Sequence, residues 1–276
     1  MLRTRFITAF ALGLPAMWLV FQANQLVFWW FLFVTVILGM WEWSRLAGIT
    51  STMARLVCTL VFGVLVLAVH YVDFYAVIDG WKVFAFLSSW WLAASIRVIR
   101  FSETSIQLGL VDIIFRYIEG CIVLLGLLLA LHLLHAQPAG PWLVLTLLFL
   151  IWGADSFAYF TGRQWGSVKL LPRVSPGKTW MGVIGGVIGG TLVASSIVFF
   201  QPLLKPDVLF VIPVIVISIL FSVMGDLFES MYKREVHLKD SSHLLPGHGG
   251  ILDRIDSLMA AAPVFVMGLF LVGVIR

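Results

Sequence analysis

The sequence predicts an all-α, polytopic integral membrane protein with about nine transmembrane helices. Of its 276 residues, 61% are hydrophobic and only 12% are charged, whereas soluble domains carry about 25% charged residues. So few polar side chains cannot cover a core this apolar, and most of the surface must therefore face lipid. No alternation typical of outer-membrane barrels is visible, so helices are the expected spanning elements.

Nine apolar runs approach the roughly 20 residues that a spanning helix needs. The first run has a basic start but lacks the small-residue exit site of a cleaved signal peptide, so we expect it to remain as a helix. The fourth run is short. The nine runs are Phe6–Phe21, Leu26–Trp43, Leu56–Val72, Val83–Ile96, Ile118–His135, Trp142–Phe160, Met181–Phe200, Val208–Gly225 and Ser257–Val274.

The distribution of Lys and Arg indicates the orientation. With nine spans and a cytoplasmic N-terminus, fifteen of the eighteen Lys and Arg residues fall on the inner side, as the positive-inside rule predicts. Only Lys82, Lys205 and Arg276 fall on the outer side. Removal of one internal span would reverse the side of each later loop, so the charges support the layout independently of hydropathy.

Two long polar connections, Thr161–Trp180 and Asp226–Asp256, lie on the cytoplasmic side in this layout, whereas the outer connections are short. The functional site is therefore expected at the cytoplasmic membrane edge. Residues 1–276 are expected to form one membrane-embedded domain without internal repeats. Within it, residues 1–140 supply N-terminal helices and residues 141–276 carry the polar motifs.

Three aspartates border the second connection. Asp226 follows the eighth apolar run, and Asp253 and Asp256 lie three residues apart at the start of the ninth, on one helical face. Acidic side chains are also favoured at helix N-termini, which is the structural alternative for Asp253 and Asp256. The functional hypothesis is that Asp226 and Asp253 hold Mg²⁺, which prefers one or two carboxylates plus phosphate oxygens and water.

Four basic residues are interleaved with these acids: Lys233, Arg234, Lys239 and Arg254. Juxtamembrane charges attracted to anionic lipid are one explanation. Acidic and basic side chains together beside a Gly-Gly turn favour a metal–phosphate centre instead, in which the Lys and Arg side chains bind phosphate oxygens. The glycines of that turn let backbone N–H groups approach phosphate. His248 either contacts phosphate, acts as acid or base, or only stabilises the turn.

The first connection carries further candidates. Asp155 lies near the end of the sixth run, and ionisable residues inside membrane spans are functional candidates by default. Ser175, Lys178 and Thr179 precede the seventh run, where a helix N-terminus favours anions; a helix cap with an interfacial lysine is the alternative. A Walker A loop is rejected, because Pro172 replaces its first glycine and no strand is expected before it.

Two features have structural interpretations. Glycines 182, 185, 186, 189 and 190 form two GxxxG patterns in the seventh run, which is typical of close helix packing. Glu42, between Trp41 and Trp43, is expected to anchor the end of the second run at the membrane surface.

These residues resemble the signature of the phosphatidate cytidylyltransferase (CDP-diacylglycerol synthase) family. The matching positions are Ser230-x-x-Lys233-Arg234, then Lys239-Asp240, then Pro246-x-His248-Gly249-Gly250-x-x-Asp253-Arg254-x-Asp256. Segments 153–156, 175–180 and 225–230 are also similar to the family. The resemblance lies in the C-terminal half, and the N-terminal half is similar only in hydropathy and in its Trp-Glu-Trp segment.

The resemblance implies a Mg²⁺-dependent transfer of a cytidylyl group from CTP to phosphatidate, which yields CDP-diacylglycerol and pyrophosphate. It implies that Asp226, Lys233 and Asp253 are catalytic, and that Asp226 and Asp253, with Asp256, bind the metal. The residues then expected to bind substrate are Asp155, Ser175, Lys178, Arg234, Lys239, His248 and Arg254.

The residues alone are also compatible with two other functions. Another CTP-dependent or polyprenyl-phosphate transferase would use the same metal–phosphate chemistry. A transporter of an anionic substrate would place its polar groups near the bilayer midplane, unlike the charges here. The expected partners are CTP, phosphatidate and membrane lipid but no nucleic acid, and a homodimer is left open. The expected location is a bacterial inner (plasma) membrane.

Overall fold

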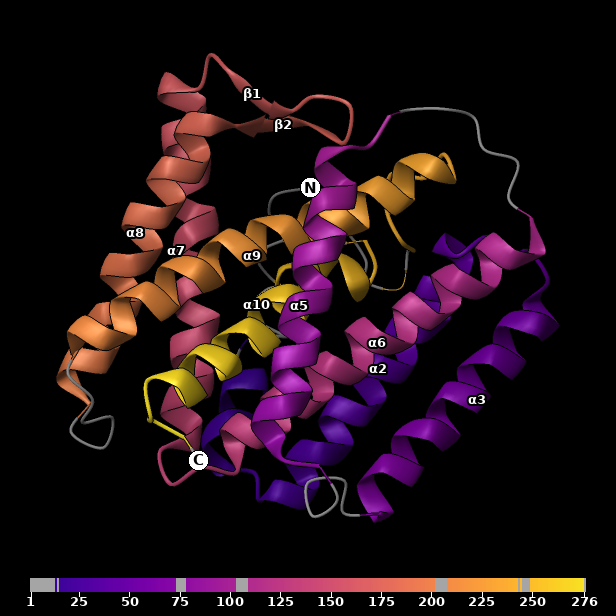
Figure 1. Cartoon of the computed structure of the whole chain (residues 1–276), viewed down its shortest axis with the longest axis horizontal. Helices are drawn as coiled ribbons and strands as arrows, with labels where there is room; N and C mark the ends of the chain where they lie inside the picture. The colour runs from indigo at the N-terminus through magenta and orange to yellow at the C-terminus, as the bar shows by residue number, and fades with distance from the viewer. Residues whose placement is uncertain are drawn as a thin grey trace.

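The computed structural model describes residue 13 and residues 15–72, 78–102, 109–201, 208–242, 244 and 249–275. Within these residues, eight helices are long and apolar enough to cross a membrane, which confirms a nearly all-helical, polytopic fold (Figure 1). They are α2 (Gln25–Leu46), α3 (Thr52–Tyr71), α5 (Gly80–Ile99), α6 (Leu110–His135), α7 (Gly140–Trp165), α8 (Trp180–Phe200), α9 (Val208–Glu235) and α10 (Leu252–Leu271). Half of the expected first span, Phe6–Phe21, lies outside the described residues, namely residues 6–12 and 14.

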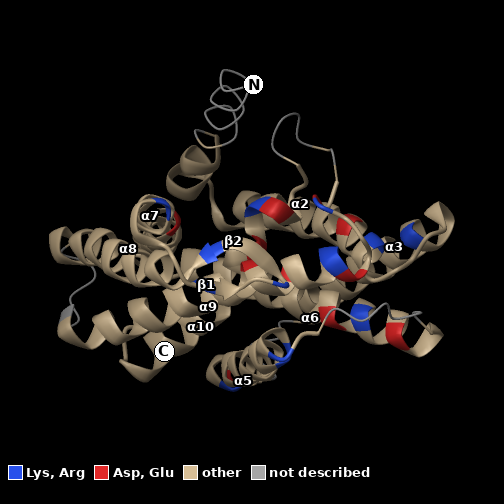
Figure 2. Cartoon of the chain, turned by 90° about the horizontal axis from the view of Figure 1, so that it is seen from above, with Lys and Arg blue, Asp and Glu red and all other residues tan. Residues whose placement is uncertain are grey.

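The two ends of the helix bundle differ in charge. The helix ends joined by the α2–α3, α5–α6, α7–α8 and α9–α10 connections lie at one end, along the top and right-hand side of Figure 1. Among the described Lys and Arg residues, all except Lys82 lie in these connections or in the adjoining helix turns. We call this end the charged end. Figure 2, viewed from this end, shows charged residues in blue and red on α2, α3 and α6. Helix α8 has no charged residue along its length.

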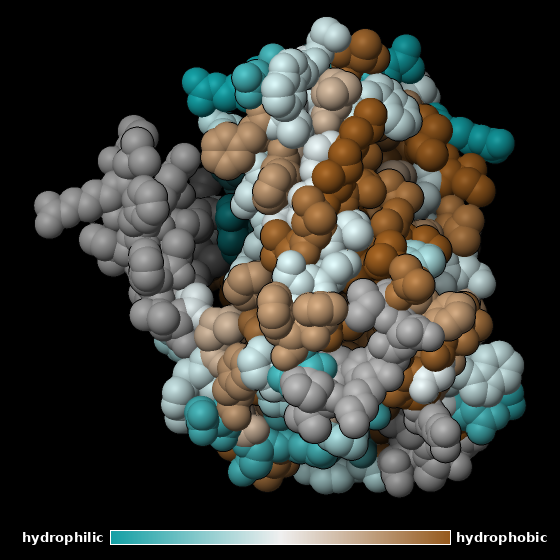
Figure 3. Space-filling model, turned by 90° about the vertical axis from the view of Figure 1, so that its left-hand side faces the viewer, coloured by the Kyte–Doolittle hydropathy of each residue, from teal (hydrophilic) through white to brown (hydrophobic). Residues whose placement is uncertain are grey.

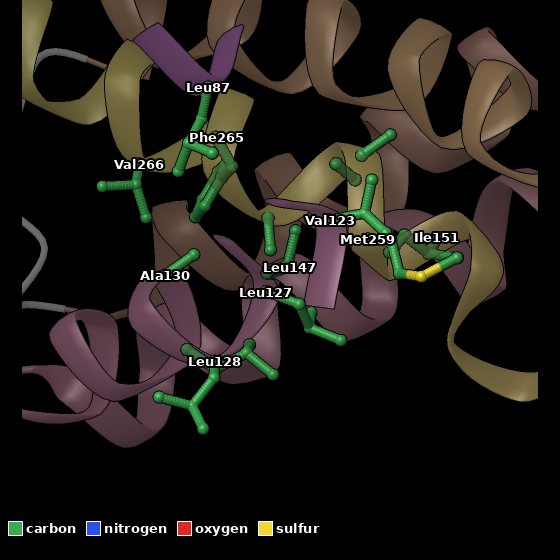
Figure 4. Close-up of a cluster of buried hydrophobic side chains, with 14 of the residues drawn as sticks. Leu87, Val123, Leu127, Leu128, Ala130, Leu147, Ile151, Met259, Phe265 and Val266 are labelled. Atoms are coloured by element: carbon green, nitrogen blue, oxygen red, sulfur yellow. The ribbon is translucent and has the colours of Figure 1, made fainter. Parts of the chain in front are cut away.

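Buried apolar side chains from α5, α6, α7 and α10 form the centre of the bundle (Figure 4). In this cluster, Leu87 of α5 lies beside Phe265 of α10, and Val123 of α6 lies toward Met259 of α10 and Ile151 of α7. The most buried of the eight spans is α10, whose alanines 260–262 have no exposed surface. Because α10 lies at the centre, polar residues in its first turn are held by neighbours on several sides.

Helices α7 and α8 pack closely because α8 presents a row of glycines, as its sequence predicts. A Cβ atom on Gly186 would lie 2.9 Å from the carbonyl oxygen of Ala154, and one on Gly190 would lie 2.8 Å from that of Leu150. These contacts are with backbone atoms, which cannot move aside as a flexible side chain can. The close approach brings the end of α7 against the start of α8, next to the segment that joins them.

The surface of α8 and α9 that faces away from the bundle is apolar. Figure 3 shows a band of hydrophobic residues between hydrophilic residues at the two ends of the molecule. Exposed apolar side chains include Ile184, Ile188 and Leu192 of α8 and Leu209 and Phe210 of α9. An apolar band bounded by polar ends is the surface expected of a protein that spans a bilayer.

Two sequence-based expectations for the charged end were wrong. The segment after α7 contains a two-stranded antiparallel hairpin, β1 (Lys169–Leu171) and β2 (Ser175–Thr179), although no strand was expected there. In addition, α9 does not end at Gly225 but continues to Glu235. Hydropathy marks where the apolar run stops, whereas the helix continues because residues 226–235 contain good helix formers and a Glu–Lys pair four residues apart.

Candidate active site

The continuation of α9 builds one wall of the candidate site. It places Asp226, Glu229, Ser230 and Lys233 on one helical face, at intervals of three and four residues. At Gly225, a Cβ atom would lie 2.5 Å from the backbone oxygen of Asp256, so glycine is what allows α9 and α10 to touch here. Asp226 and Asp256 consequently lie close enough to interact electrostatically.

Lys233 joins the two helices through a buried ion-pair cluster. Its Nζ lies 2.8 Å from Glu229 Oε2 and 2.7 Å from Asp253 Oδ1. Asp253 Oδ2 also accepts hydrogen bonds from the backbone N–H of Gly250 at 2.7 Å and from the hydroxyl of Ser241 at 3.0 Å. Three partners therefore fix the position of the Asp253 carboxylate relative to α9.

A second cluster lies beside the hairpin. Lys178 Nζ of β2 lies 2.7 Å from Asp226 Oδ2, and Ser230 Oγ donates to Asp226 Oδ1 at 3.2 Å. Asp155 of α7 interacts electrostatically with both Lys178 and Asp226. Arg234 Nε donates to the backbone oxygen of Val174 at 3.2 Å, which ties the hairpin turn to α9. Residues far apart in the sequence thus converge at the charged end.

A cavity of about 530 Å³ opens next to this second cluster, between α7, α8, α9 and β2. One part of its wall is polar and charged, with Asp155, Arg163, Lys169 and Lys178. Another part is apolar and is formed by residues of α8 and α9, namely Val183, Ile219 and Val223. Such a cavity suits an amphipathic ligand with an anionic head and an apolar tail.

The remaining candidates differ in their placement. Ser175 begins β2, opposite Leu171 in the hairpin, and does not line the cavity that Lys178 and Thr179 line. Thr179 caps α8, because its side-chain oxygen accepts the Gly182 N–H at 3.1 Å. Lys239 and Arg254 are exposed, and Arg254 directly follows Asp253 in the first turn of α10. His248 lies outside the described residues.

A family model described as the Cytidylyltransferase family matches residues 3–272, which is nearly the whole chain. The chain belongs to the cytidylyltransferase family. Relatives named phosphatidate cytidylyltransferase match it over almost their full lengths. The Pseudomonas aeruginosa protein is 37% identical over 273 residues, covering 99% of this chain and 98% of the relative. The Haemophilus influenzae protein is 36% identical over 281 residues, and the Brucella abortus protein 32% over 294.

Three residues that contact the candidate site of this cytidylyltransferase were not predicted from the sequence. Glu229 and Ser241 contact the Lys233–Asp253 pair directly, and Glu42, far away in the sequence, binds the loop before α10. Glu229 could have been found, because a glutamate four residues before a lysine faces it on a helix. Glu42 was expected at the membrane surface, yet its side chain is fully buried. Nothing in the local sequence indicates which distant segment it contacts.

The carboxylates at the charged end are candidate ligands of a divalent cation. Among the described residues, no three acidic, His or Cys side chains converge closely enough to hold an ion by themselves. However, Glu229 Oε1 is buried without a hydrogen-bond partner, and Glu229 interacts electrostatically with Asp253 and Asp256. An unsatisfied carboxylate oxygen beside further carboxylates fits a cation that takes its remaining ligands from phosphate and water.

Proposed function

We propose that this cytidylyltransferase transfers the cytidylyl group of CTP to phosphatidate, which gives CDP-diacylglycerol and pyrophosphate. The names of its relatives support this activity. We further propose that the charged end faces the cytoplasm, where CTP is available, and that the protein resides in the inner membrane of a bacterium.

The cavity beside Asp226 is the observation that carries this proposal. Phosphatidate has an anionic phosphate on two acyl chains, and the cavity combines basic residues with an apolar wall of α8 and α9. In this proposal, Lys178 and Arg163 bind the lipid phosphate, and the acyl chains extend along the apolar wall toward the bilayer. A nucleoside triphosphate alone has no apolar chain that would pack against that wall.

The reaction follows from charge. A phosphatidate oxygen attacks the α-phosphorus of CTP, a new P–O bond forms, and the bond to the β-phosphate oxygen breaks as pyrophosphate leaves. Both reactants are anionic, so their approach requires fixed positive charge at the reacting centre. Lys178 and Lys233 supply this charge. Phosphatidate already carries an ionised oxygen near neutral pH, so no strong general base and no covalent enzyme intermediate are proposed.

We propose Mg²⁺ as the cofactor, with Asp226, Asp253 and Asp256 as its protein ligands and Glu229 beside them. When bound, the ion would neutralise charge on the phosphate oxygens. Asp226 now pairs with Lys178 and Asp253 with Lys233. These lysines hold the carboxylates in place and are themselves drawn toward incoming phosphates.

The test is an assay of detergent-purified protein with radiolabelled CTP, with and without Mg²⁺. We expect labelled lipid and pyrophosphate with phosphatidate, and neither without Mg²⁺. Labelling of a polyprenyl phosphate in its place would identify the alternative transferase. Uptake of an anion into protein-containing vesicles, without product formation, would instead identify a transporter.

We also propose a homodimer. Helix α3 buries only Thr59, Phe62, Gly63 and Val66 and leaves one apolar face exposed. Cross-linking of cysteines introduced on that face would give a dimer band, and its absence at every position would contradict the proposal.

A further inference from the structure

Both carboxylate oxygens of Glu42, in α2, accept hydrogen bonds from residues that precede or begin α10. Its side chain is fully buried. Oε2 accepts the Leu252 N–H at 2.8 Å and the Ser241 hydroxyl at 3.0 Å. Oε1 accepts the Ile251 N–H at 3.0 Å and the Ser242 hydroxyl at 2.5 Å. Each Glu42 oxygen thus has one backbone donor and one hydroxyl, and the Ser241 hydroxyl shares its single hydrogen between Glu42 Oε2 and Asp253 Oδ2.

This carboxylate substitutes for a missing helix cap. The N-cap residue of α10, Ile251, has no side-chain acceptor for the first N–H groups of the helix. Unpaired N–H groups at a buried helix start are costly, and a negative charge there is favourable. Glu42 supplies both the acceptor and the charge from a helix about 200 residues earlier in the sequence.

The same loop holds Asp253. Ser241 donates its backbone N–H to Asp253 Oδ2 at 3.1 Å, and its hydroxyl lies 3.0 Å from both Asp253 Oδ2 and Glu42 Oε2. The Gly250 N–H also donates to Asp253. The contacts therefore run from Glu42, through Ser241 and residues 250–252, to the carboxylate that pairs with Lys233.

The Gly-Gly pair of the signature has a physical cause in this arrangement. A Cβ atom on Gly250 would lie 2.6 Å from Glu42 Oε2, and one on Gly249 would lie 2.7 Å from Asp253 Oδ2. Gly249 also has φ +85°, a conformation that other residues rarely adopt. Glycine is needed at both positions because a carboxylate oxygen occupies the space that a Cβ atom would fill.

We propose that Glu42 is a positioning residue for this cytidylyltransferase, which acts by fixing residues 241, 242 and 250–252 and thereby the Asp253–Lys233 pair. The inference rests on the proposed function. Glu42 does not line the cavity, and both of its oxygens are engaged by the loop, so it is not a group that contacts the substrate. The N-terminal half of the chain thus contributes directly to the order of the site.

The test compares Glu42→Gln with wild type. Gln has the same shape, but its amide nitrogen cannot accept two of the four hydrogen bonds. We expect kcat to fall about 10–100-fold, as is usual when a supporting hydrogen bond is lost, with little change in either KM. Hydrogen exchange should become faster at the amides of residues 250–252 but not in α5 or α6.

Asp79→Asn is the control, because Asp79 lies at the opposite end in an exposed pair with Lys82, and it should match wild type in both measurements. An unchanged kcat in Glu42→Gln, or a lower kcat without faster exchange in the loop, would overturn the inference. Inactive wild-type protein would instead overturn the proposed function, while the exchange measurement would still report on the loop.

Ser241→Ala covers the case in which Glu42→Gln does not fold. It removes the hydroxyl between the two carboxylates and leaves Glu42 bound to the Ile251 and Leu252 N–H groups. We expect a lower kcat with loop exchange close to wild type. Wild-type turnover in this variant would contradict transmission through Ser241. If both single variants fold, their combined effect should be smaller than additive, because they interrupt one series of contacts.

Discussion

Lys233 has two buried carboxylate partners, and only 11% of its side chain is exposed. Lys233→Ala would leave Glu229 and Asp253 together without a counter-charge. Removal of one partner from a buried ion pair costs about 3–5 kcal/mol, so this variant should lose thermal stability in detergent as well as turnover. Asp253→Asn in the same chain should restore part of the stability but none of the activity. An unchanged melting temperature in the single variant would contradict this role.

Lys178 should respond differently. Its pair with Asp226 is partly open to solvent, with 26% and 31% of the two side chains exposed, and such pairs stabilise a fold by only about 0–1 kcal/mol. Lys178→Gln should therefore keep the wild-type melting temperature and lose turnover by a factor on the order of 10². Stability without turnover would separate a substrate-binding lysine from Lys233, which also supports the fold. Wild-type turnover would remove Lys178 from the site.

Among the elements, α8 sets the distance between the cavity walls. Gly186→Val would push α8 away from the Ala154 carbonyl, next to Asp155. Overpacking of this kind typically costs about 1–3 kcal/mol, so both the melting temperature and the turnover should fall. Ile188→Val on the same helix is the matched control, because Ile188 is 57% exposed on the lipid-facing side. Equal behaviour of the two variants would show that α8 does not set this distance.

Elements also show where sequence-based prediction succeeds. The spans were predictable because lipid imposes length and hydropathy on each of them separately. The extension of α9 to Glu235 and the β1–β2 hairpin were not, because both lie beyond the apolar runs and depend on contacts such as Arg234 with Val174. The signature residues of α9 and α10 were found because they are close in sequence. Glu42 could not be placed, because its partners are about 200 residues away.

For the whole molecule, the orientation in the membrane is the main prediction. The charged end should face the cytoplasm, so a cysteine at position 79 should react with an impermeant maleimide in intact cells, in a chain without Cys58 and Cys121. A cysteine at position 167, in the α7–α8 connection, should react only after permeabilisation. The reverse pattern would place the site away from CTP and would contradict the proposed function.

The attachment of Glu42 to the α10 loop also limits how such proteins can be rearranged in evolution. Residues 141–276 contain every signature position but not the acceptor that holds their loop. Recombination that exchanged only the first helices between relatives would succeed where the incoming α2 carried a carboxylate at the same depth. Elsewhere it would give a chain with an intact motif and a disordered site. Motif searches alone would not distinguish these two products.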